Sequence, residues 1–405
     1  MKHERMKLKL ALWSLLALST VGAKAQQTSR DLVGRQNAIT TTVPFLLIAP
    51  DARGGSLGDA GVATTPDANS LHYNVGKFAF IEKPGAVSIT YTPWLRQLVD
   101  GVSLSYLSGY GRLNKNSVVG GSLRFFSLGT IQYTDENALS LGQFNPSELA
   151  LDGFYSVKLS EHFSMGIAMR FIYSNLVGNI NIGGVDSRPG VAGAGDIGMY
   201  YQNKKRLKNK KDLEYALGLS ITNIGNKITY TSDAQRDFIP INMRIGGFTK
   251  YKVDDYNSIG FALDFNKLLV PTPPVYLIDD SSGKIQVGPG GPIVYSGKSS
   301  DVPVIEGMLQ SFSDAPNGFR EELQEISIST GFEWWYREQF ALRAGYFHEN
   351  VNKGNRKYLT FGMGVRYKVF GLDLSYLAAI QQRNPLQNTL RFSLLFDFAA
   401  FKDAE

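Results

Sequence analysis

Apolar and polar residues alternate in short segments along most of this chain, from about Ala86 to Phe398. In the last of these segments one parity is wholly apolar: Leu390, Phe392, Leu394, Phe396 and Phe398. The other parity carries Arg391, Ser393 and Asp397. Successive side chains of a β-strand point to opposite faces, so this segment has one apolar and one polar face. Segments of about ten residues with this alternation, separated by turn residues, are typical of a transmembrane β-barrel.

The pattern predicts an all-β barrel of fourteen antiparallel strands within residues 86–405. The strands are expected to begin near Ala86, Gly101, Ser117, Glu148, Phe163, Gly190, Glu214, Ile241, Ser258, Glu325, Phe340, Tyr358, Gly371 and Thr389. The odd-numbered connections average about 18 residues and the even-numbered ones about 5, as expected for long extracellular loops and short periplasmic turns. This parity places both termini in the periplasm. A large soluble β-sandwich or repeat protein is the alternative fold.

The first 25 residues have the features of a cleaved export signal. Basic residues are followed by an apolar run over residues 10–18 and by Ala23-Lys24-Ala25, a small-x-small cleavage site. The run is shorter than the roughly 17–25 residues of a spanning helix, so we expect Gln26 to begin a mature outer-membrane protein of a Gram-negative cell. Removing residues 1–25, with five Lys/Arg and one acid, lowers the net charge from +6 to +2. A nucleic-acid partner is therefore not expected.

Charged residues on the inward parity define a predicted lumen. They are Arg124, Asp152, Lys158, Arg170, Asp196, Arg244, Asp264, Glu333, Arg343, Arg366, Asp373, Arg391 and Asp397. A charge facing lipid near the midplane costs roughly 2–4 kcal/mol, so these side chains are expected to point inward. Seven are cationic and six anionic. The balance favours an ion-pair network that braces the wall over a selectivity lining, which is usually of one sign.

Residues 26–85 precede the barrel and contain two conspicuous stretches. One is rich in small residues, from Asp51 to Ala63, and the other runs from Asp67 to Asn74. Together they resemble the N-terminal hatch of the FadL-like outer-membrane proteins, which lies inside a fourteen-stranded barrel. Residues 41–56 resemble more closely the opening of the PorV subfamily, a component of type IX secretion in Bacteroidota. The usual Asn-Pro-Ala of FadL-like proteins is Asn74-Val75-Gly76 here, which departs from the pattern linked to hydrophobic-ligand transport.

The resemblance implies a shuttle or adaptor and no enzyme. Such a protein would take the C-terminal signal domain of secreted cargo from the SprA/Sov translocon to the PorU sortase and its attachment-complex proteins. The hatch residues expected to act as plug and gate are Asp51, Arg53, Gly54, Gly55, Ser56, Gly58, Asp59, Asn69 and Asn74. Besides these proteins and the outer-membrane bilayer, no partner is implied. With no cysteine and four histidines, no metal site and no cofactor is expected.

The connection over residues 270–324 is far longer than usual, which indicates function or disorder. It combines Pro-Gly punctuation with apolar anchors, of which the candidate docking residues are Tyr276, Leu277, Ile293, Tyr295, Met308 and Phe312. A purely solvated loop would carry fewer apolar side chains. The connection is expected either to fold back over the barrel mouth or to bind a partner.

Two other functions remain open at this point. A FadL-type diffusion channel for fatty acids or aromatic hydrocarbons would need an apolar luminal pocket with a lateral opening. An enzyme acting on lipopolysaccharide acyl chains would use Ser56, since Gly54–Gly58 fits G-x-S-x-G. That motif requires Ser on a strand-to-helix turn with a His and an acid nearby. Pro50 and Asp51 interrupt any strand leading into Gly54, so close packing of small residues is the preferred interpretation.

Overall fold

The computed structural model describes residues 28–398 except 95–100, 135–138, 179–180, 183–184, 208–210, 232–235, 280 and 381–385. The expected signal peptide and Gln26 lie outside the described residues.

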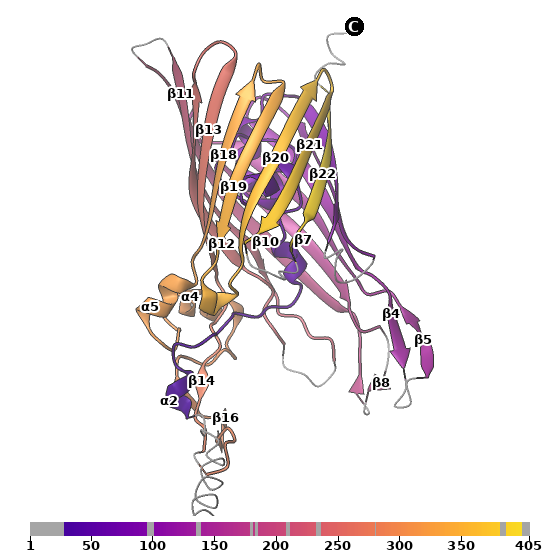
Figure 1. Ribbon diagram of the computed structural model, residues 1–405, viewed down its shortest axis with the longest axis vertical. Coiled ribbons are helices and arrows are strands. Elements are labelled where there is room, and N and C mark those ends of the chain that lie inside the picture. Colours follow the sequence, from indigo (N-terminus) through magenta and orange to yellow (C-terminus); the bar gives the residue numbers. More distant parts are fainter. Residues whose placement is uncertain are drawn as a thin grey trace, which may run out of the picture.

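Fourteen antiparallel strands close into a barrel, as predicted (Figure 1). They are β1 (Gly85–Pro93), β2 (Val102–Arg112), β3 (Ser117–Leu128), β6 (Ser147–Lys158), β7 (Phe163–Asn175), β10 (Gly190–Arg206), β11 (Asp212–Gly225), β12 (Asn242–Lys252), β13 (Asn257–Leu268), β18 (Ser327–Tyr336), β19 (Phe340–His348), β20 (Lys357–Tyr367), β21 (Phe370–Ala379) and β22 (Thr389–Asp397). Pairing of β1 with β22, through Ala86 and Asp397, closes the ring. Every strand starts within two residues of its predicted position.

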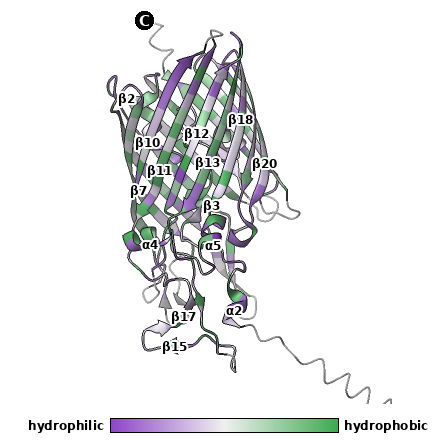
Figure 2. Ribbon diagram, turned by 90° about the vertical axis from the view of Figure 1, so that its left-hand side faces the viewer, coloured by the Kyte–Doolittle hydropathy of each residue, from purple (hydrophilic) through white to green (hydrophobic). Residues whose placement is uncertain are grey.

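The two parities of each strand face different surroundings. On β7, Ile167 is 55% exposed, whereas its neighbours Gly166 and Ala168 are buried. On β22, Leu394 is exposed and Ser393 is fully buried. Figure 2 shows hydrophobic residues recurring along the strands around the wall. The outer face is therefore the apolar one, and the inner face carries the polar and charged side chains.

The long connections gather at one end of the barrel, opposite the C-terminal end (Figure 1). We call this the loop end and the opposite rim the turn end. The connections carry β4 (Ile131–Thr134), β5 (Ser140–Phe144), β8 (Asn181–Ile182), β9 (Val185–Asp186) and η4 (Val351–Lys353). Between β13 and β18 lie β14 (Val275–Tyr276), β15 (Val287–Gly288), β16 (Gly291–Pro292), β17 (Val294–Ser296), α4 (Val304–Gln310) and α5 (Phe319–Gln324). Among the described residues no helix has the length and apolar character needed to cross a membrane.

The chain before β1 passes through the lumen from the loop end to the turn end. It forms α2 (Ser29–Leu32), η1 (Pro44–Leu47), α3 (Ala52–Ser56), η2 (Ser70–His72) and η3 (Val75–Phe80). At the loop end, the Ser29 hydroxyl accepts a hydrogen bond from the backbone N–H of Ile278 at 2.7 Å. At the turn end, Arg112 donates to the carbonyl of Ile81 at 2.7 Å. We call residues 43–81 the plug.

This path differs from the expectation that both termini lie at the turn end. The first described residues lie beside β14 at the loop end, while β22 ends at the opposite rim (Figure 1). The difference arises because the plug passes once through the lumen before β1, a passage that the count of strand crossings does not include. Two apolar clusters fix that passage. Val43, Phe45 and Leu46 pack against inward residues near the loop end, and Leu71, Val75 and Phe78 pack near the turn end.

Candidate functional site

Arg53 of α3 joins the plug to the barrel wall. Its Nε and Nη2 donate to the two carboxylate oxygens of Glu333 on β18, at 3.1 and 3.0 Å. Its Nη1 donates to Asp67 at 2.9 Å and to the carbonyl of Thr65 at 3.0 Å. Glu333 in turn accepts from Arg343 Nε at 2.6 Å. A hatch residue and wall residues are thus parts of one buried structure.

The same chain of charges continues along the inside of the wall. Arg343 Nη1 binds Asp373 at 2.8 Å, and Arg366 Nη2 binds the other oxygen of Asp373 at 2.6 Å. Acid and base therefore alternate from Asp67 through Arg53, Glu333, Arg343 and Asp373 to Arg366. Buried charges are tolerated when they are paired and hydrogen-bonded in this way. This arrangement fits the bracing interpretation of the predicted lumen charges.

A second buried group braces β6, β7 and β10. Arg170 binds Asp152 at 2.5 Å and Asp196 at 3.0 Å. Arg170 also donates to the side chain of Asn223, and Asp196 accepts from the backbone N–H of Asn223 at 2.7 Å. Asp397, the last of the predicted lumen charges, is only half-buried and pairs with Lys83 at the turn end.

A third group is cationic and lacks such compensation. The ring of His72 lies between Arg124 and Arg244, with Nδ1 3.0 Å from Arg124 Nη2 and Nε2 3.2 Å from Arg244 Nη2. In the described part of the chain, neither guanidinium has a carboxylate within ion-pair distance, and the nearest carboxylate oxygen to Arg391 is that of Asp59 at 3.7 Å. The three arginines were predicted as lumen residues, whereas His72 was not. No local pattern marks a histidine that two distant strands will bracket.

Plug glycines allow close packing inside the plug and against the wall. A Cβ on Gly54 or Gly61 would overlap the ring or hydroxyl of Tyr73, and one on Gly55 would overlap Arg391. Gly58 has φ +68°, a left-handed conformation that a side chain would strain, and it lies against the backbone of Tyr346. These contacts account for the small residues of the hatch motif.

The wall has a matching set of glycines beneath the plug. Inward Cβ atoms would meet plug atoms at less than 3 Å at Gly166, Gly198, Gly218, Gly246, Gly331, Gly345 and Gly362. They lie on β7, β10, β11, β12, β18, β19 and β20. Glycine in a strand interior often marks a close approach of another backbone. Their inward parity was a usable sequence signal for a plug in contact with the wall.

Polar side chains satisfy the irregular backbone of the plug. Asp264 of β13 accepts from the N–H groups of Gly61 and Val62 at 2.7 and 2.9 Å. Asn74 donates to the carbonyls of Val62 and Met199 at 3.0 and 2.8 Å, and Asn69 accepts from Ser108 at 2.9 Å. Asp51 caps α3 by accepting from Gly54 N–H at 2.8 Å. Buried backbone groups need such partners, so these hatch residues hold the plug in one conformation.

Ser56 has none of the contacts of a nucleophile. Its hydroxyl is fully buried and donates to the carbonyl of Arg53 at 2.7 Å, within the turn of α3. Its own carbonyl accepts from Thr360 at 3.0 Å. The nearest histidine in the chain, His72, is held by the two arginines described above. Within the described residues, no cluster of three or more His, Asp or Glu side chains is arranged to hold a metal ion.

Buried lysines fasten the long connection to the barrel rim. Lys267 of β13 binds Glu322 at 3.0 Å and Glu325 at 2.5 Å. Lys353 binds Glu321 at 2.6 Å and Glu325 at 2.9 Å. These glutamates belong to α5 or follow it directly, so α5 has a fixed position at the loop end.

The candidate docking residues have different environments. Met308 packs against the apolar cluster at the barrel mouth, and Tyr276 and Leu277 are half-buried. Ile293, Tyr295 and Phe312 are exposed. Four further exposed apolar side chains of α4 and α5 are not among these candidates: Ile305, Leu309, Phe319 and Leu323. The helices have seven and six residues, too short for an apolar periodicity to be recognised.

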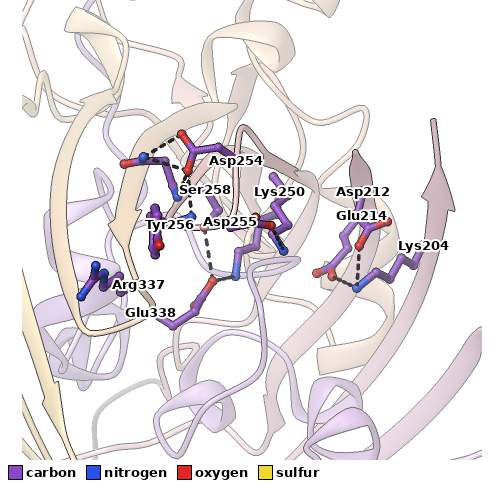
Figure 3. A pocket seen from close by; sticks show the side chains of 12 residues that line it. Lys204, Asp212, Glu214, Lys250, Asp254, Asp255, Tyr256, Ser258, Arg337 and Glu338 are labelled. Carbon is purple, nitrogen blue, oxygen red and sulfur yellow. Dashed lines mark hydrogen bonds and ion pairs between the residues drawn. The ribbon is translucent and has the colours of Figure 1, made fainter. Parts of the chain in front are cut away.

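A charged groove at the turn end is lined by residues of β10–β13 and by Arg337 and Glu338, which follow β18 (Figure 3). Lys204 pairs with Glu214 at 3.0 Å, and Lys250 pairs with Glu338 at 2.8 Å. The Arg337 guanidinium lies 4.6 Å from the centre of the Tyr256 ring. The Asp254 carboxylate accepts hydrogen bonds from Asn257 and from the backbone N–H of Tyr256, which hold its pKa below the ordinary value. Exposed charges of both signs define a solvated rim and favour no one class of ligand.

Comparison with known families decides the identity of this plugged barrel. The family described as "Type IX secretion system protein PorV" matches residues 32–275, which include the plug and β1 to β13. The chain belongs to the PorV family. It is accordingly an outer-membrane β-barrel component of type IX secretion. No curated protein matches the chain.

Solved structures similar to this PorV-family chain include two toluene transporters and a FadL homologue. The Pseudomonas putida toluene transporter TodX is 10% identical, with 85% of this chain and 98% of that chain covered and a TM-score of 0.47. The Ralstonia pickettii toluene transporter TbuX is 10% identical over 87% and 98% of the two chains, with a TM-score of 0.43. A Pseudomonas aeruginosa FadL homologue is 13% identical over 90% and 100%, with a TM-score of 0.39. Assignment to the PorV family rests on the sequence match alone.

Proposed function

We propose that this PorV-family barrel is an adaptor that binds the C-terminal signal domain of secreted cargo at its loop end. It would receive the cargo from the SprA/Sov translocon and deliver it to the PorU sortase complex. The observation that carries this proposal is a set of exposed apolar side chains on α4, on α5 and in the segment between them. We call it the α4–α5 face, and it consists of Ile305, Leu309, Phe312, Phe319 and Leu323.

Burial and charge explain why this face is suited to a protein partner. Leu309 is 70% exposed and Phe319 is 76% exposed. Large exposed apolar side chains are frequent at interaction sites, where a few residues, often aromatic, contribute much of the binding energy. Lys267 and Lys353 hold α5 in place through buried ion pairs, so little conformational entropy is lost when a partner binds.

The closed lumen supports adaptor activity over conduction. The plug residues from Ala49 to Thr64 are buried except Asp59, and Arg53 links them to Glu333 through two hydrogen bonds. In this proposal the hatch is a fixed plug and supports the loop end from inside. A diffusion channel for hydrophobic molecules would need an apolar luminal pocket, whereas the cavity at the loop end of the lumen is lined in part by Arg244, Asp59 and Glu349.

Substitutions on the α4–α5 face test the proposal. Leu309→Ser combined with Phe319→Ser should reduce binding of a purified cargo C-terminal domain at least about 10-fold, because two exposed anchors are lost. Leu113→Ser is the matched control, since Leu113 is 61% exposed at the turn end. Binding is measured with the purified barrel immobilised in neutral detergent. Folding of each variant is checked by the heat-dependent gel shift of a closed barrel.

If the double variant binds the cargo domain as strongly as the control does, docking on this face is refuted. Loss of binding in both variants would place the interaction elsewhere or make it non-specific. Loss confined to the double variant, with a normal gel shift, is the expected result.

A further inference from the structure

Arg244 lies beside a cavity at the loop end of the lumen. The cavity has a volume of about 410 Å³ and lies between the start of the plug and strands β12, β13, β18, β19 and β20. Its floor includes Arg244, Asn266 and Ser329, which come from three neighbouring strands. Arg244 and Asn266 face each other across β12 and β13. Arg356, 46% exposed, and the exposed Thr40 connect the lining to solvent.

Three polar atoms in this floor have no hydrogen-bond partner within the described protein. They are Arg244 Nη1, Asn266 Oδ1 and Ser329 Oγ, all buried. Arg244 is 6% exposed and Ser329 is fully buried. Asp59 Oδ1, elsewhere on the lining, is a fourth such atom. Buried polar groups are nearly always hydrogen-bonded, so these orphaned atoms around one cavity indicate that the cavity holds something polar. The Asn266 amide can present either its oxygen or its nitrogen to such a group.

The charges around the cavity give the sign of its occupant. Lys353 pairs with Glu325 and Arg356 pairs with Glu349, which neutralises these lining residues. Asp59 accepts from Tyr358, and Arg391 lies 3.7 Å from its other oxygen. Arg244 is left as the lining cation that has no carboxylate within ion-pair distance in the described part of the chain.

His72 cannot supply the missing compensation. A neutral imidazole has one acceptor nitrogen and one N–H, and a protonated one has no acceptor. His72 contacts both Arg124 and Arg244 through its two nitrogens, so at most one guanidinium donates to it. The Tyr73 ring, with its centroid 5.3 Å from the Arg244 guanidinium, offers a weaker cation–π contact. A buried guanidinium in this state favours an anion that accepts from Nη1.

We propose that this cavity binds a small oxyanion group, a carboxylate or a phosphate, with Arg244 as the principal ligand and Ser329 as a second donor. The shared chemistry is two or more oxygens that accept from a guanidinium, carried either by a free ion or by the end of a larger molecule. The proposal is independent of cargo docking, because it uses none of the residues of the α4–α5 face. Binding would tie the start of the plug to β12 and β18.

Thermal unfolding of the purified full-length mature protein in a neutral detergent tests this site. Inorganic phosphate, acetate and glycerol phosphate are titrated separately, each against chloride at the same ionic strength. Wild type should show a saturable rise in Tm of at least about 2 °C with one or more of the oxyanions and none with chloride. A response to inorganic phosphate or acetate identifies a free ion as sufficient. A response to glycerol phosphate alone identifies a group carried on a larger molecule.

Variants separate the site from general salt effects. Arg244→Gln should lose the rise in Tm, and in chloride alone it should be at least as stable as wild type, because an uncompensated buried charge has been removed. Ser329→Ala should weaken the apparent affinity about 5-fold or more. Arg366→Gln is the control, since Arg366 lies at the turn end paired with Asp373, and it should respond like wild type.

Equal effects of oxyanions and chloride on wild type would overturn the proposal, as would an unchanged response in Arg244→Gln. If Arg244→Gln does not fold, the test is the apparent oxyanion affinity of Ser329→Ala compared with that of the control Arg366→Gln. An affinity unchanged by Ser329→Ala would then refute the assigned floor.

Discussion

Arg53 and Glu333, 280 positions apart in the chain, meet through two roughly parallel hydrogen bonds of 3.1 and 3.0 Å. Both side chains are almost completely buried. A paired guanidinium and carboxylate fix orientation as well as distance. The plug is therefore held at a defined position along β18, and the alternating charges beyond Glu333 extend this constraint across β19, β20 and β21.

Glu333→Gln should destabilise the folded barrel by roughly 3–5 kcal/mol, because it leaves Arg53 and Arg343 buried beside a neutral group. Glu338→Gln is the matched control, since Glu338 is exposed and its pairing with Lys250 is expected to contribute about 0–1 kcal/mol. Urea unfolding in detergent micelles gives both values. Similar losses for the two variants would show that the buried link has no special weight.

Gly345→Ala should displace the plug, because its Cβ would overlap the backbone nitrogen of Gly58. We expect the free energy of unfolding to fall by about 1–3 kcal/mol and the ion conductance in planar bilayers to rise. Gly153→Ala is the control, since nothing lies within 4 Å of the added Cβ. A conductance that stays at the wild-type level in Gly345→Ala would contradict the contact between wall and plug.

Ile167→Arg should impair membrane assembly by roughly 2–4 kcal/mol, because it puts a charge on the lipid-facing parity of β7. Leu159→Arg, in the exposed turn after β6, should assemble normally. The fraction of protein in the folded, heat-modifiable form measures this. Inward positions such as Gly166 are unsuitable controls, since Gly166 lies under the backbone of Val75. Normal assembly of Ile167→Arg would mean that the two faces were assigned the wrong way round.

Asp314 should make the anchoring of the long connection depend on pH. Burial, reinforced by Glu322 and Glu325, raises the pKa of Asp314 to about 6 from 3.8. A raised carboxyl pKa favours the protonated folded form, so stability should fall as the pH rises from about 4 to about 6 and then level off. Asp314→Asn should remove this dependence. At pH 7 the backbone amides around residue 314 should exchange hydrogen more slowly in Asp314→Asn than in wild type.

Hydrogen exchange of residues 311–325 checks this prediction. At each pH, the exchange rate of wild type is divided by the exchange rate of Asp314→Asn. The ratio should be near one at pH 4 and should increase up to about pH 6. A ratio that is independent of pH would exclude Asp314 as the titrating group. Strands β19 to β22 provide the internal reference, since their exchange should be the same in both proteins.

Ser56→Ala should leave secretion intact and cost about 0.5–1.5 kcal/mol, because the hydroxyl only donates to the carbonyl of Arg53. Surface attachment of cargo in cells that carry the variant is the measurement. Loss of lipopolysaccharide deacylation at wild-type protein levels would instead restore the hydrolase interpretation.

Strand positions and faces were predictable because the signal is local. The period-2 pattern of Leu390 to Phe398 needs only its own segment, and β22 follows it. The inward charges were also predictable, since lipid excludes them. Their partners were not, because the contact of Arg53 with Glu333 and of His72 with Arg244 depends on how distant strands close around the plug. The ion pairs of Lys267 and Lys353 were likewise not predictable, because they depend on α5 packing beside the two lysines.

The route of the plug also constrains how the protein is made. The chain crosses the membrane once more than its fourteen strands do, because residues 43–81 run through the lumen before β1 begins. The plug lies close against wall glycines of seven strands, from Gly166 on β7 to Gly362 on β20, and Arg53 pairs with Glu333, so these contacts oppose its insertion into a closed ring. β22, which follows the other thirteen barrel strands in the chain, completes the ring by pairing with β1. We therefore expect the wall to assemble around the plug segment, with the pairing of β22 and β1 closing the ring.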